Sequence, residues 1–449
     1  MKNLEFLIRN QKLVLSVYGL GNVGGPITAA WLRQGAKVIG VDISTTLLSQ
    51  IKAGLSHSKE PFVSNTLLKG LQKNNLSLTT NGVDASRASQ IKIVTVPVDT
   101  INNKVNLTSL ISATTDIARG LKKHDVVVIS PSLPPGTTEN LVLPILEKHS
   151  KLRAKNDFHL IYNPERIFEG RALQDIEEHY PAIVAGIDEK SLKFGESLLK
   201  IISKKGVMTL SSISTAEAEK LFEGVYRDVN IALANELAIF SQKMNIDFWE
   251  ARKGANSQPY CHLHYPGTGV GGLCIPIYPQ FIIESAKKVG QNMEILEFAR
   301  RLNDSMPKEC VKNALALLTK HRKISEKKSK IAILGLGFRG DVADSRLSPT
   351  YTVVDEFLKK GFVVSVHDPF IKNDTTLPSA VLLSDKLDEI IENADLIFVS
   401  TDHKMYSKLT KTSFSKAKKP LLVFDGRNIV NKNNFKNIAI QTIGMKQND

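Results

Sequence analysis

Short apolar runs recur at intervals through the first third of the chain. Runs of five or six residues at 13–18, 37–41, 91–96 and 126–130 are rich in Val, Ile and Leu and predict β-strands. The last two are each followed by a proline-bearing loop and a stretch with helical spacing. Strands that alternate with helices are typical of an α/β fold with a doubly wound, Rossmann-like sheet.

The first two strands frame a dinucleotide-binding fingerprint. The first strand breaks into Gly19-x-Gly21-x-x-Gly24, a helical pattern follows, and the second strand ends at Asp42. The pyrophosphate would rest on the helix N-terminus, and Asp42 would bind ribose hydroxyls, which favours NAD over NADP. Ser132, in the loop 131–139, is a further candidate, although a hydroxyl in a turn is more often a local cap. The predicted cofactor contacts are Gly19, Gly21, Asn22, Val23, Gly24, Asp42, Pro97 and Ser132.

The strand pattern returns in the last third of the chain. Apolar runs at 330–334, 362–368, 394–400 and 421–425 predict a second sheet, and the lysine-rich segment 321–328 before it is interpreted as a linker. The glycines Gly335, Gly337 and Gly340 lead into Asp341 and not into an apolar helical run. We therefore expect a second Rossmann-like sheet that need not bind NAD.

A long helical pattern separates the two predicted sheets. Apolar positions from 214 to about 253 recur mostly at steps of three and four, and Ser214 with Glu217 predicts a capping box at the start. A helix of about 40 residues would be about 60 Å long. We expect it to bridge two domains and to pack against a second copy of the chain. Helical spacing resumes over 279–321, so the expected domains are 1–210, 211–322 and 323–449.

A glycine-rich segment near the middle of the chain carries a cysteine. The run 266–276 places four glycines within eight residues of Cys274 and is bracketed by prolines, unlike a flexible Gly/Ser linker. We interpret it as a fixed loop that holds a thiol against a ligand. The alternative is a buried structural cysteine beside a tight turn.

Two acidic residues follow a proline after residue 160. If the segment after Pro164 forms one helical turn, Glu165 and Glu169 lie on one face and can manage a proton or a water. The alternative is a solvated surface pair.

Composition limits the possible classes of protein. A chain of 449 residues with 42% apolar content is expected to form two or three domains. No apolar run approaches the ~20 residues of a membrane span and the first eleven residues are charged, so we expect a cytoplasmic protein. The three cysteines lack metal-ligand spacing, so no metal is expected. The net charge of +14 is spread over scattered lysines, which favours small phosphate-bearing ligands, or a simple solvated surface, over nucleic acid.

Taken together, these motifs resemble the UDP-glucose/GDP-mannose dehydrogenase family over nearly the whole chain. The resemblance rests on the Gly19 fingerprint and on five further motifs in the family's order. These are Pro134-Pro135-Gly136-Thr137-Thr138, Asn163-Pro164-Glu165, Ala216-Glu217-Ala218-Glu219-Lys220, the loop 267–276, and the segment 338–349. Within the family, the segment 226–236 is similar to the UDP-N-acetyl-D-mannosamine dehydrogenase branch.

The resemblance implies a four-electron, NAD-dependent oxidation of a UDP-sugar C6 alcohol to a carboxylate. Cys274 would form the thiohemiacetal and thioester, Lys220 would stabilise the alkoxide, and Glu165 and Glu169 would handle water. The favoured substrate is UDP-N-acetyl-D-mannosamine, with UDP-glucose, UDP-GlcNAc or UDP-GalNAc as alternatives. The predicted substrate contacts are Glu165, Arg166, Lys220, Gly267, Gly269, Gly271, Gly272, Phe338, Arg339 and Arg346, with Arg346 gripping the diphosphate.

The sequence departs from the family pattern at five positions. Gly224 and Tyr278 stand where the family usually has Asn and Asp, and Tyr260 aligns with an Arg that reaches a neighbouring subunit's substrate. Leu273 and Arg339 stand where His and Lys are frequent.

These departures leave three interpretations of the chemistry. The first is an active enzyme with a rebuilt proton relay through Tyr278, or through His262 and His264. The others are a two-electron dehydrogenase without a thiol intermediate and a nucleotide-sugar-binding protein without turnover. Retention of Lys220, Cys274 and Glu169 favours an active enzyme.

Overall fold

The computed structural model describes residues 2–55, 60, 62–101, 104–322, 329–435 and 438–445. Most of the predicted linker, residues 323–328, lies outside this range. The chain divides into two compact units: residues 1–223 with 280–289, and residues 224–279 with 290–449. The three-domain division at 210 and 322 stays a prediction.

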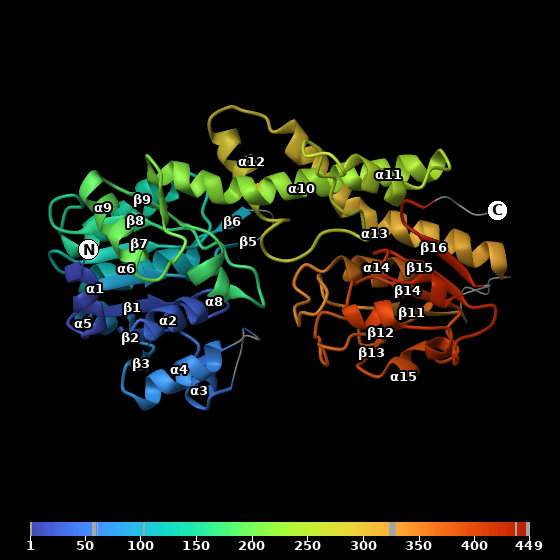
Figure 1. The fold of residues 1–449 in the computed structure, drawn as a ribbon, viewed down its shortest axis with the longest axis horizontal. Helices are drawn as coiled ribbons and strands as arrows, with labels where there is room; N and C mark the ends of the chain where they lie inside the picture. Colours follow the sequence, from blue (N-terminus) through green and yellow to red (C-terminus); the bar gives the residue numbers. More distant parts are fainter. Residues whose placement is uncertain are drawn as a thin grey trace. The chain divides into compact units, whose positions relative to one another are not determined.

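In the described residues, the first unit contains an eight-stranded sheet in the order β10-β9-β8-β7-β4-β1-β2-β3 (Figure 1). Neighbouring strands are parallel except for β8 and β9. The order reverses at β1, which pairs with β2 on one side and β4 on the other. The strands are β1 (Val14–Tyr18), β2 (Lys37–Val41), β3 (Leu76–Thr79), β4 (Ile91–Val94), β7 (Val126–Ile129), β8 (His159–Tyr162), β9 (Ala182–Gly186) and β10 (Val207–Thr209). The four predicted strands are confirmed.

Helices cover both faces of this sheet, so its central strands are buried on both sides. In β7, Val126 and Val128 belong to one apolar core, whereas Val127 and Ile129 belong to the other. This explains why the central strands appear in the sequence as continuous apolar runs. The helices of this unit are α1 (Lys2–Arg9), α2 (Gly24–Arg33), α3 (Thr45–Lys52), α4 (Val63–Gln72), α5 (Gly82–Ala88), α6 (Thr108–Gly120), α7 (Leu143–Ser150), α8 (Ala172–Gln174) and α9 (Glu189–Leu199). A short hairpin joins β5 (Asp99–Ile101) and β6 (Lys104–Asn106).

The second unit repeats this construction with a parallel sheet, six-stranded in the described residues, in the order β13-β12-β11-β14-β15-β16 (Figure 1). Its strands are β11 (Lys330–Leu334), β12 (Val363–His367), β13 (Leu382–Ser384), β14 (Leu396–Val399), β15 (Leu422–Asp425) and β16 (Ala439–Thr442). Side chains of β11 again alternate between two cores, with Ile331 and Ile333 in one and Ala332 and Leu334 in the other. The prediction of two Rossmann-like sheets is confirmed.

The long helix is shorter than predicted. α10 (Ile213–Lys243) has 31 residues, or about 46 Å, and a separate helix α11 (Phe248–Ala255) follows. The chain turns at Asn245, which has φ +59, and Asp247 then caps α11 by accepting from the amides of Trp249 and Glu250. Even so, α10 begins in the first unit and ends in the second, so it joins the two units as predicted.

The predicted capping box at the start of α10 is wrong. Ser212 is the capping residue, since its Oγ accepts from the Thr215 amide at 3.1 Å. Ser214 instead donates to Glu139, and Glu217 binds a different part of the chain.

The helical stretch predicted over 279–321 is interrupted. α12 (Tyr278–Lys288) and α13 (Glu294–His321) are separated by a turn in which Gly290 has φ +74. The remaining helices are α14 (Pro349–Lys359) and α15 (Leu387–Ile391). None of the helices within the described ranges has the length and apolar content needed to cross a bilayer.

Candidate functional site

The loop after β1 forms a cradle of bare backbone. Gly19 has φ +89, and a Cβ on Gly24 would overlap the carbonyl oxygen of Gly19. Only glycine at 24 therefore lets α2 start directly at this loop. At Gly21 an added Cβ would meet nothing within 4 Å, so this side of the loop is open. A close-fitting glycine turn at the N-terminus of a helix fits a pyrophosphate.

Asp42 completes the cradle. Its two carboxylate oxygens accept from the amides of Leu20 at 2.8 Å and Ser44 at 2.9 Å, and the residue is only half-buried. It therefore ties the loop after β1 to the end of β2 and keeps an accessible edge for a ribose. The other predicted cofactor contacts, Asn22, Val23, Pro97 and Ser132, follow β1, β4 and β7 at the same carboxyl edge of parallel strands. The described residues fit NAD.

Glu165 and Lys220 form a largely buried pair in the first unit. Lys220 Nζ lies 3.8 Å from Glu165 Oε1, and the two side chains are 9% and 11% exposed. Burial raises the pKa of Glu165, and the nearby Lys220 charge opposes that rise. The segment 163–168 is irregular, with a turn at 169–170, so the helical turn expected to align Glu165 with Glu169 is absent from this described segment. Whether the two carboxylates act together stays a prediction.

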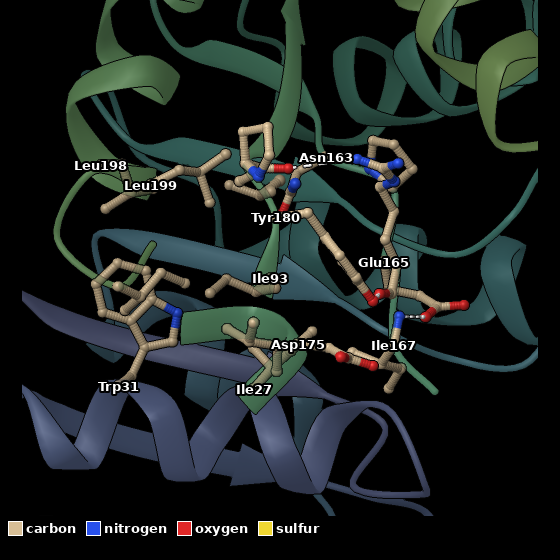
Figure 2. A pocket seen from close by; sticks show the side chains of 17 residues that line it. Ile27, Trp31, Ile93, Asn163, Glu165, Ile167, Asp175, Tyr180, Leu198 and Leu199 are labelled. Atoms are coloured by element: carbon tan, nitrogen blue, oxygen red, sulfur yellow. Dashed lines mark hydrogen bonds between the residues drawn. The ribbon is translucent and has the colours of Figure 1, made fainter. Parts of the chain in front are cut away.

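An apolar cavity of about 60 Å³ is lined in part by Glu165 (Figure 2). Trp31, Ile93 and Leu198 line one side of the cavity, whereas Glu165 lies on the opposite side. The Ile167 amide donates to Glu165 Oε2 at 3.1 Å and fixes the carboxylate there. A carboxylate beside an apolar space is poorly solvated, which favours its protonated form.

Arg166, a predicted substrate contact, forms an ion pair with a glutamate on α10. Its Nε and Nη2 donate to Glu223 Oε1 at 2.9 and 2.6 Å, and Glu219 Oε1 lies 3.8 Å from Nε. Burial and then the Glu223 charge raise the pKa of Glu219 to about 7, against the charge of Arg166. Glu223 shares no motif with Arg166, which lies 57 positions away, so no local pattern predicts this pair.

Glu217 and Glu60 hold the loops around the site, and the sequence predicted neither role. Glu217 on α10 accepts from the Gly136 amide at 2.5 Å and the Thr138 amide at 2.8 Å, and burial raises its pKa to about 7. Glu60 is buried and accepts from the amides of Gly170 at 2.5 Å and Ala172 at 2.9 Å. Glu60 thus fixes the turn that carries Glu169, although it lies 110 positions from Gly170.

In the second unit, the cysteine loop is seated on the loop after β11. The Gly272 amide donates to the Arg346 carbonyl at 3.0 Å. A Cβ on Gly271 would lie 2.6 Å from the Leu347 carbonyl oxygen and 2.7 Å from Phe338 Cβ. One on Gly269 would lie 2.9 Å from a ring carbon of Pro349. The glycines are required for this approach, and the loop is fixed, as predicted.

The three cysteines have different environments. Cys274 is exposed, Cys261 is half-buried, and Cys310 is buried with its pKa raised to about 12 by that burial. The alternative of a buried structural cysteine therefore describes Cys310 and not Cys274. The Cys274 carbonyl accepts from the amides of Ile277 at 3.1 Å and Tyr278 at 2.9 Å, which places Cys274 at the N-terminal end of α12.

Arg346 is oriented by its own loop. Its Nε donates to Asp344 Oδ1 at 2.8 Å, and its side chain is 50% exposed. The Asp344 carboxylate holds one edge of the guanidinium, a group whose planar fork suits a diphosphate. The second unit thus brings Gly269, Gly271, Gly272, Phe338 and Arg346 together, whereas Gly267 lies against Arg427. Glu165, Arg166 and Lys220 belong to the first unit.

The chain matches three domain models of one family. Residues 13–203 match the NAD binding domain, residues 214–305 the central domain, and residues 332–432 the UDP binding domain of the UDP-glucose/GDP-mannose dehydrogenase family.

Relatives that are named as dehydrogenases cover most of the chain. A UDP-N-acetyl-D-mannosamine dehydrogenase of Methanocaldococcus jannaschii is 34% identical over 428 residues, covering 93% of each chain. The solved UDP-D-ManNAc dehydrogenase of Pyrococcus horikoshii is 29% identical, with a TM-score of 0.88 over 96% of this chain and 99% of its own. The solved NDP-N-acetyl-D-galactosaminuronic acid dehydrogenase of Methanosarcina mazei is 29% identical, with a TM-score of 0.82 over 99% of this chain and 98% of its own.

Proposed function

Because the chain belongs to the UDP-glucose/GDP-mannose dehydrogenase family, we propose that it oxidises the C6 hydroxyl of UDP-N-acetyl-D-mannosamine to a carboxylate. One observation carries the proposal: an exposed thiol, Cys274, follows a glycine loop seated on the loop that bears Arg346. This couples a candidate nucleophile to a candidate diphosphate contact within one unit. The names of the relatives supply the sugar.

The loop 19–24 and Asp42 would hold NAD at the first sheet, and NAD would supply the hydride acceptor for each of the two oxidations. The first hydride loss leaves a C6 aldehyde and releases a proton. The Cys274 thiolate then adds to the aldehyde carbon, and loss of a second hydride from the thiohemiacetal gives a thioester. Water cleaves the carbon–sulfur bond, which yields the carboxylate and frees the thiolate.

The buried pair in the first unit supports two further roles. The Lys220 ammonium stabilises the developing alkoxide, and Glu165 and Glu169 position or deprotonate water. Removal of an oxyanion-stabilising group typically lowers kcat by about 10²–10³, so we expect that loss for Lys220→Ala. Turnover near the parent rate would remove Lys220 from the mechanism.

Counting NADH per sugar tests the proposed chemistry. The parent enzyme should form two NADH per UDP-N-acetylmannosamine consumed, and Cys274→Ser should stop before the carboxylate. One NADH per sugar in the parent, or carboxylate formation by Cys274→Ser at the parent rate, would contradict the thioester route. Cys310→Ser, a substitution of a buried cysteine, is the matched control.

A second candidate substrate is an N-acetylgalactosamine nucleotide, because the Methanosarcina mazei neighbour is named for that sugar acid. A panel of UDP-ManNAc, UDP-GlcNAc, UDP-GalNAc and UDP-glucose separates the candidates by kcat/KM. We expect the highest value for UDP-ManNAc.

We also propose a cytoplasmic homodimer that pairs through α10. Tyr226, Leu233 and Phe240 lie seven residues apart on this helix and are 54%, 43% and 53% exposed. Residues at that spacing share one helix face, and exposed apolar stripes mark interfaces. Light scattering should give a mass near 99 kDa, twice the 49.5 kDa of the chain, and Leu233→Glu should lower it. A mass near 49.5 kDa for the parent would refute the dimer. Cysteines that carry thiols and not disulfides suit the reducing cytoplasm.

A further inference from the structure

A glycine stands in the middle of α10, where it weakens the helix. Gly224 lies eleven residues after the first residue of α10, and an interior glycine costs about 1 kcal/mol relative to alanine. The structure supplies a reason for it. A Cβ on Gly224 would overlap Cδ2 of Tyr278 and lie 3.2 Å from its Cγ. The Tyr278 ring therefore occupies the space that any side chain at 224 would need.

The same tyrosine is bonded to the turn that carries the exposed thiol. Tyr278 is buried, and its amide donates to the Cys274 carbonyl at 2.9 Å, alongside the bond from the Ile277 amide at 3.1 Å. One turn of backbone thus connects a buried anchor to Cys274. A fixed anchor limits the directions in which the thiol can point.

The position of the contact along the chain is also informative. The second unit begins at Gly224 in α10, and its first segment ends at Pro279 in α12 before the unit resumes at Gly290. The Tyr278 ring therefore meets Gly224 where both helices leave this unit. The contact packs the start of α12 directly against the backbone of α10.

We propose that Tyr278 is a positioning residue for Cys274, and that its ring does this by packing on the bare backbone of Gly224. The proposal rests on the proposed function, in which Cys274 is the nucleophile. Gly224 and Tyr278 then act as a coupled pair. A larger residue at position 224 would displace the Tyr278 ring, and the displaced ring would move the turn that carries the Cys274 thiol.

A double-mutant cycle tests the coupling. Gly224→Ala and Tyr278→Ala should each lower kcat at least tenfold with KM changed less than threefold, because the thiol is misdirected while the substrate contacts remain. The double variant should lose no more than Tyr278→Ala alone, since the methyl group added at position 224 then meets no ring. Tyr278→Phe keeps the ring and should therefore lose less kcat than Tyr278→Ala does.

The chain offers a matched control for the glycine. Gly254 in α11 has no atom within 4 Å of an added Cβ, so Gly254→Ala changes the same residue type in a helix without a collision. It should leave kcat unchanged. The rate of iodoacetamide labelling at Cys274, measured by peptide mass spectrometry, should change at least threefold in Gly224→Ala and not in Gly254→Ala.

Several results would overturn the inference. It fails if Gly224→Ala behaves as Gly254→Ala does, if the two single losses add, or if Tyr278→Phe loses as much as Tyr278→Ala. Should Gly224→Ala not fold, an unchanged labelling rate in Tyr278→Ala is sufficient to reject it. Carboxylate formation by Cys274→Ser would reject the proposed function instead, so the two failures are distinguishable.

Discussion

Asp42 and Asp368 hold equivalent positions in the two sheets. Asp42 directly follows β2, and Asp368 directly follows β12. Both accept a hydrogen bond from the loop after the first strand, from the Leu20 amide in one case and the Leu336 amide in the other, each at 2.8 Å. Their surroundings differ. Asp42 is half-buried and accepts one further amide, whereas Asp368 is fully buried. One acid keeps an edge for a ligand and the other does not.

The bonding of Asp368 shows how this position is used in the second sheet. Oδ2 accepts from the amides of Leu336 and Gly337, and Oδ1 accepts from those of Phe370 and Ile371. His403 Nε2 lies 3.2 Å from Oδ2, and because His403 Nδ1 accepts from a backbone amide, Nε2 carries the proton and donates. These five donors are all part of the protein, so Asp368 is a structural residue.

The two sheets also differ in where the helix begins after the loop that follows the first strand. α2 starts at Gly24, the last glycine of its fingerprint, whereas α14 starts at Pro349, nine residues after Gly340. The intervening segment carries Arg346, and Arg339 directly precedes it. The first sheet thus offers a helix N-terminus to a phosphate, and the second offers arginine side chains on a loop. We therefore propose that one fold binds nucleotides in two different ways.

The largest expected effect comes from replacing the buried acid. In Asp368→Asn one carboxylate oxygen becomes an NH₂ group that faces N–H donors, which leaves buried donors unsatisfied. We expect the free energy of unfolding of the second unit to fall by about 3 kcal/mol. Denaturant unfolding at pH 7 measures this. Asp402→Asn, an exposed carboxylate that accepts from the Gly340 amide, is the control and should change it by less than about 0.5 kcal/mol. Equal losses in the two variants would contradict the structural role.

Asp368 also makes part of the stability of the second unit sensitive to acid. Burial acts to raise the pKa of Asp368, but hydrogen bonds from His403 and the Gly337 amide lower it overall. Its contribution to stability is therefore present above the unfolded pKa of about 3.9 and is lost as the pH falls through the lower folded pKa. Asp368→Asn should remove this part of the acid dependence.

The next largest effect is expected from the replacement of Asp42. Asp42→Ala removes the proposed ribose contact and the bonds to Leu20 and Ser44, so we expect the Kd for NAD⁺ to rise about tenfold, or about 1.4 kcal/mol. The free energy of unfolding should change by less than about 1 kcal/mol, because Asp42 is half-buried. Calorimetric titration measures the affinity. Ser44→Ala, which removes only the cap of α3, should leave the Kd within twofold. An unchanged Kd in Asp42→Ala would place the ribose elsewhere.

The sequence predicted central strands of both sheets but missed β8, whose Leu160 and Ile161 enter two different cores. β7, β14 and residues 331–334 of β11 appear as continuous apolar runs because alternate side chains enter two different cores. In β1 and β4 the apolar run is interrupted by the buried Ser16 and Lys92. The edge strand β10 was missed, since Met208 and Thr209 are exposed and three residues carry no clear period. The break after α10 was missed because Asn245 and Asp247 are polar residues that a long helix also tolerates. Only the left-handed φ of Asn245 marks the turn.

The glycine motifs were predictable as fixed loops, but the surfaces they approach were not. Gly24 meets its own loop and is predictable from local sequence, whereas Gly271 meets Phe338, 67 positions away. Glu60 is the extreme case, because nothing near it indicates that it holds the turn after Glu169. Such contacts depend on the order of strands in the sheet, which no local pattern contains.

The smallest expected effect is a pH-dependent gain in stability when Glu219, in the first unit, is replaced. Burial and the Glu223 charge raise the pKa of Glu219 to about 7, so its ionised form destabilises the first unit. The penalty is absent below the unfolded pKa of about 4.3, grows as the pH rises, and is complete above about 7. This is opposite in sign to Asp368. Because the Glu219 side chain is a quarter exposed, Glu219→Gln should stabilise the protein by only about 1 kcal/mol at pH 8 and by almost nothing at pH 5.

Thermal unfolding at the two pH values measures the difference, with Glu236→Gln, an exposed position on the same helix, as the control. The control should show no pH-dependent gain, because water already solvates that carboxylate. If Glu219→Gln stabilises equally at pH 5 and pH 8, the gain comes from a new hydrogen bond and not from relief of charge. The contrast between Glu219, whose surroundings favour the protonated form, and Asp368, whose surroundings favour the ionised form, would then rest on Asp368 alone.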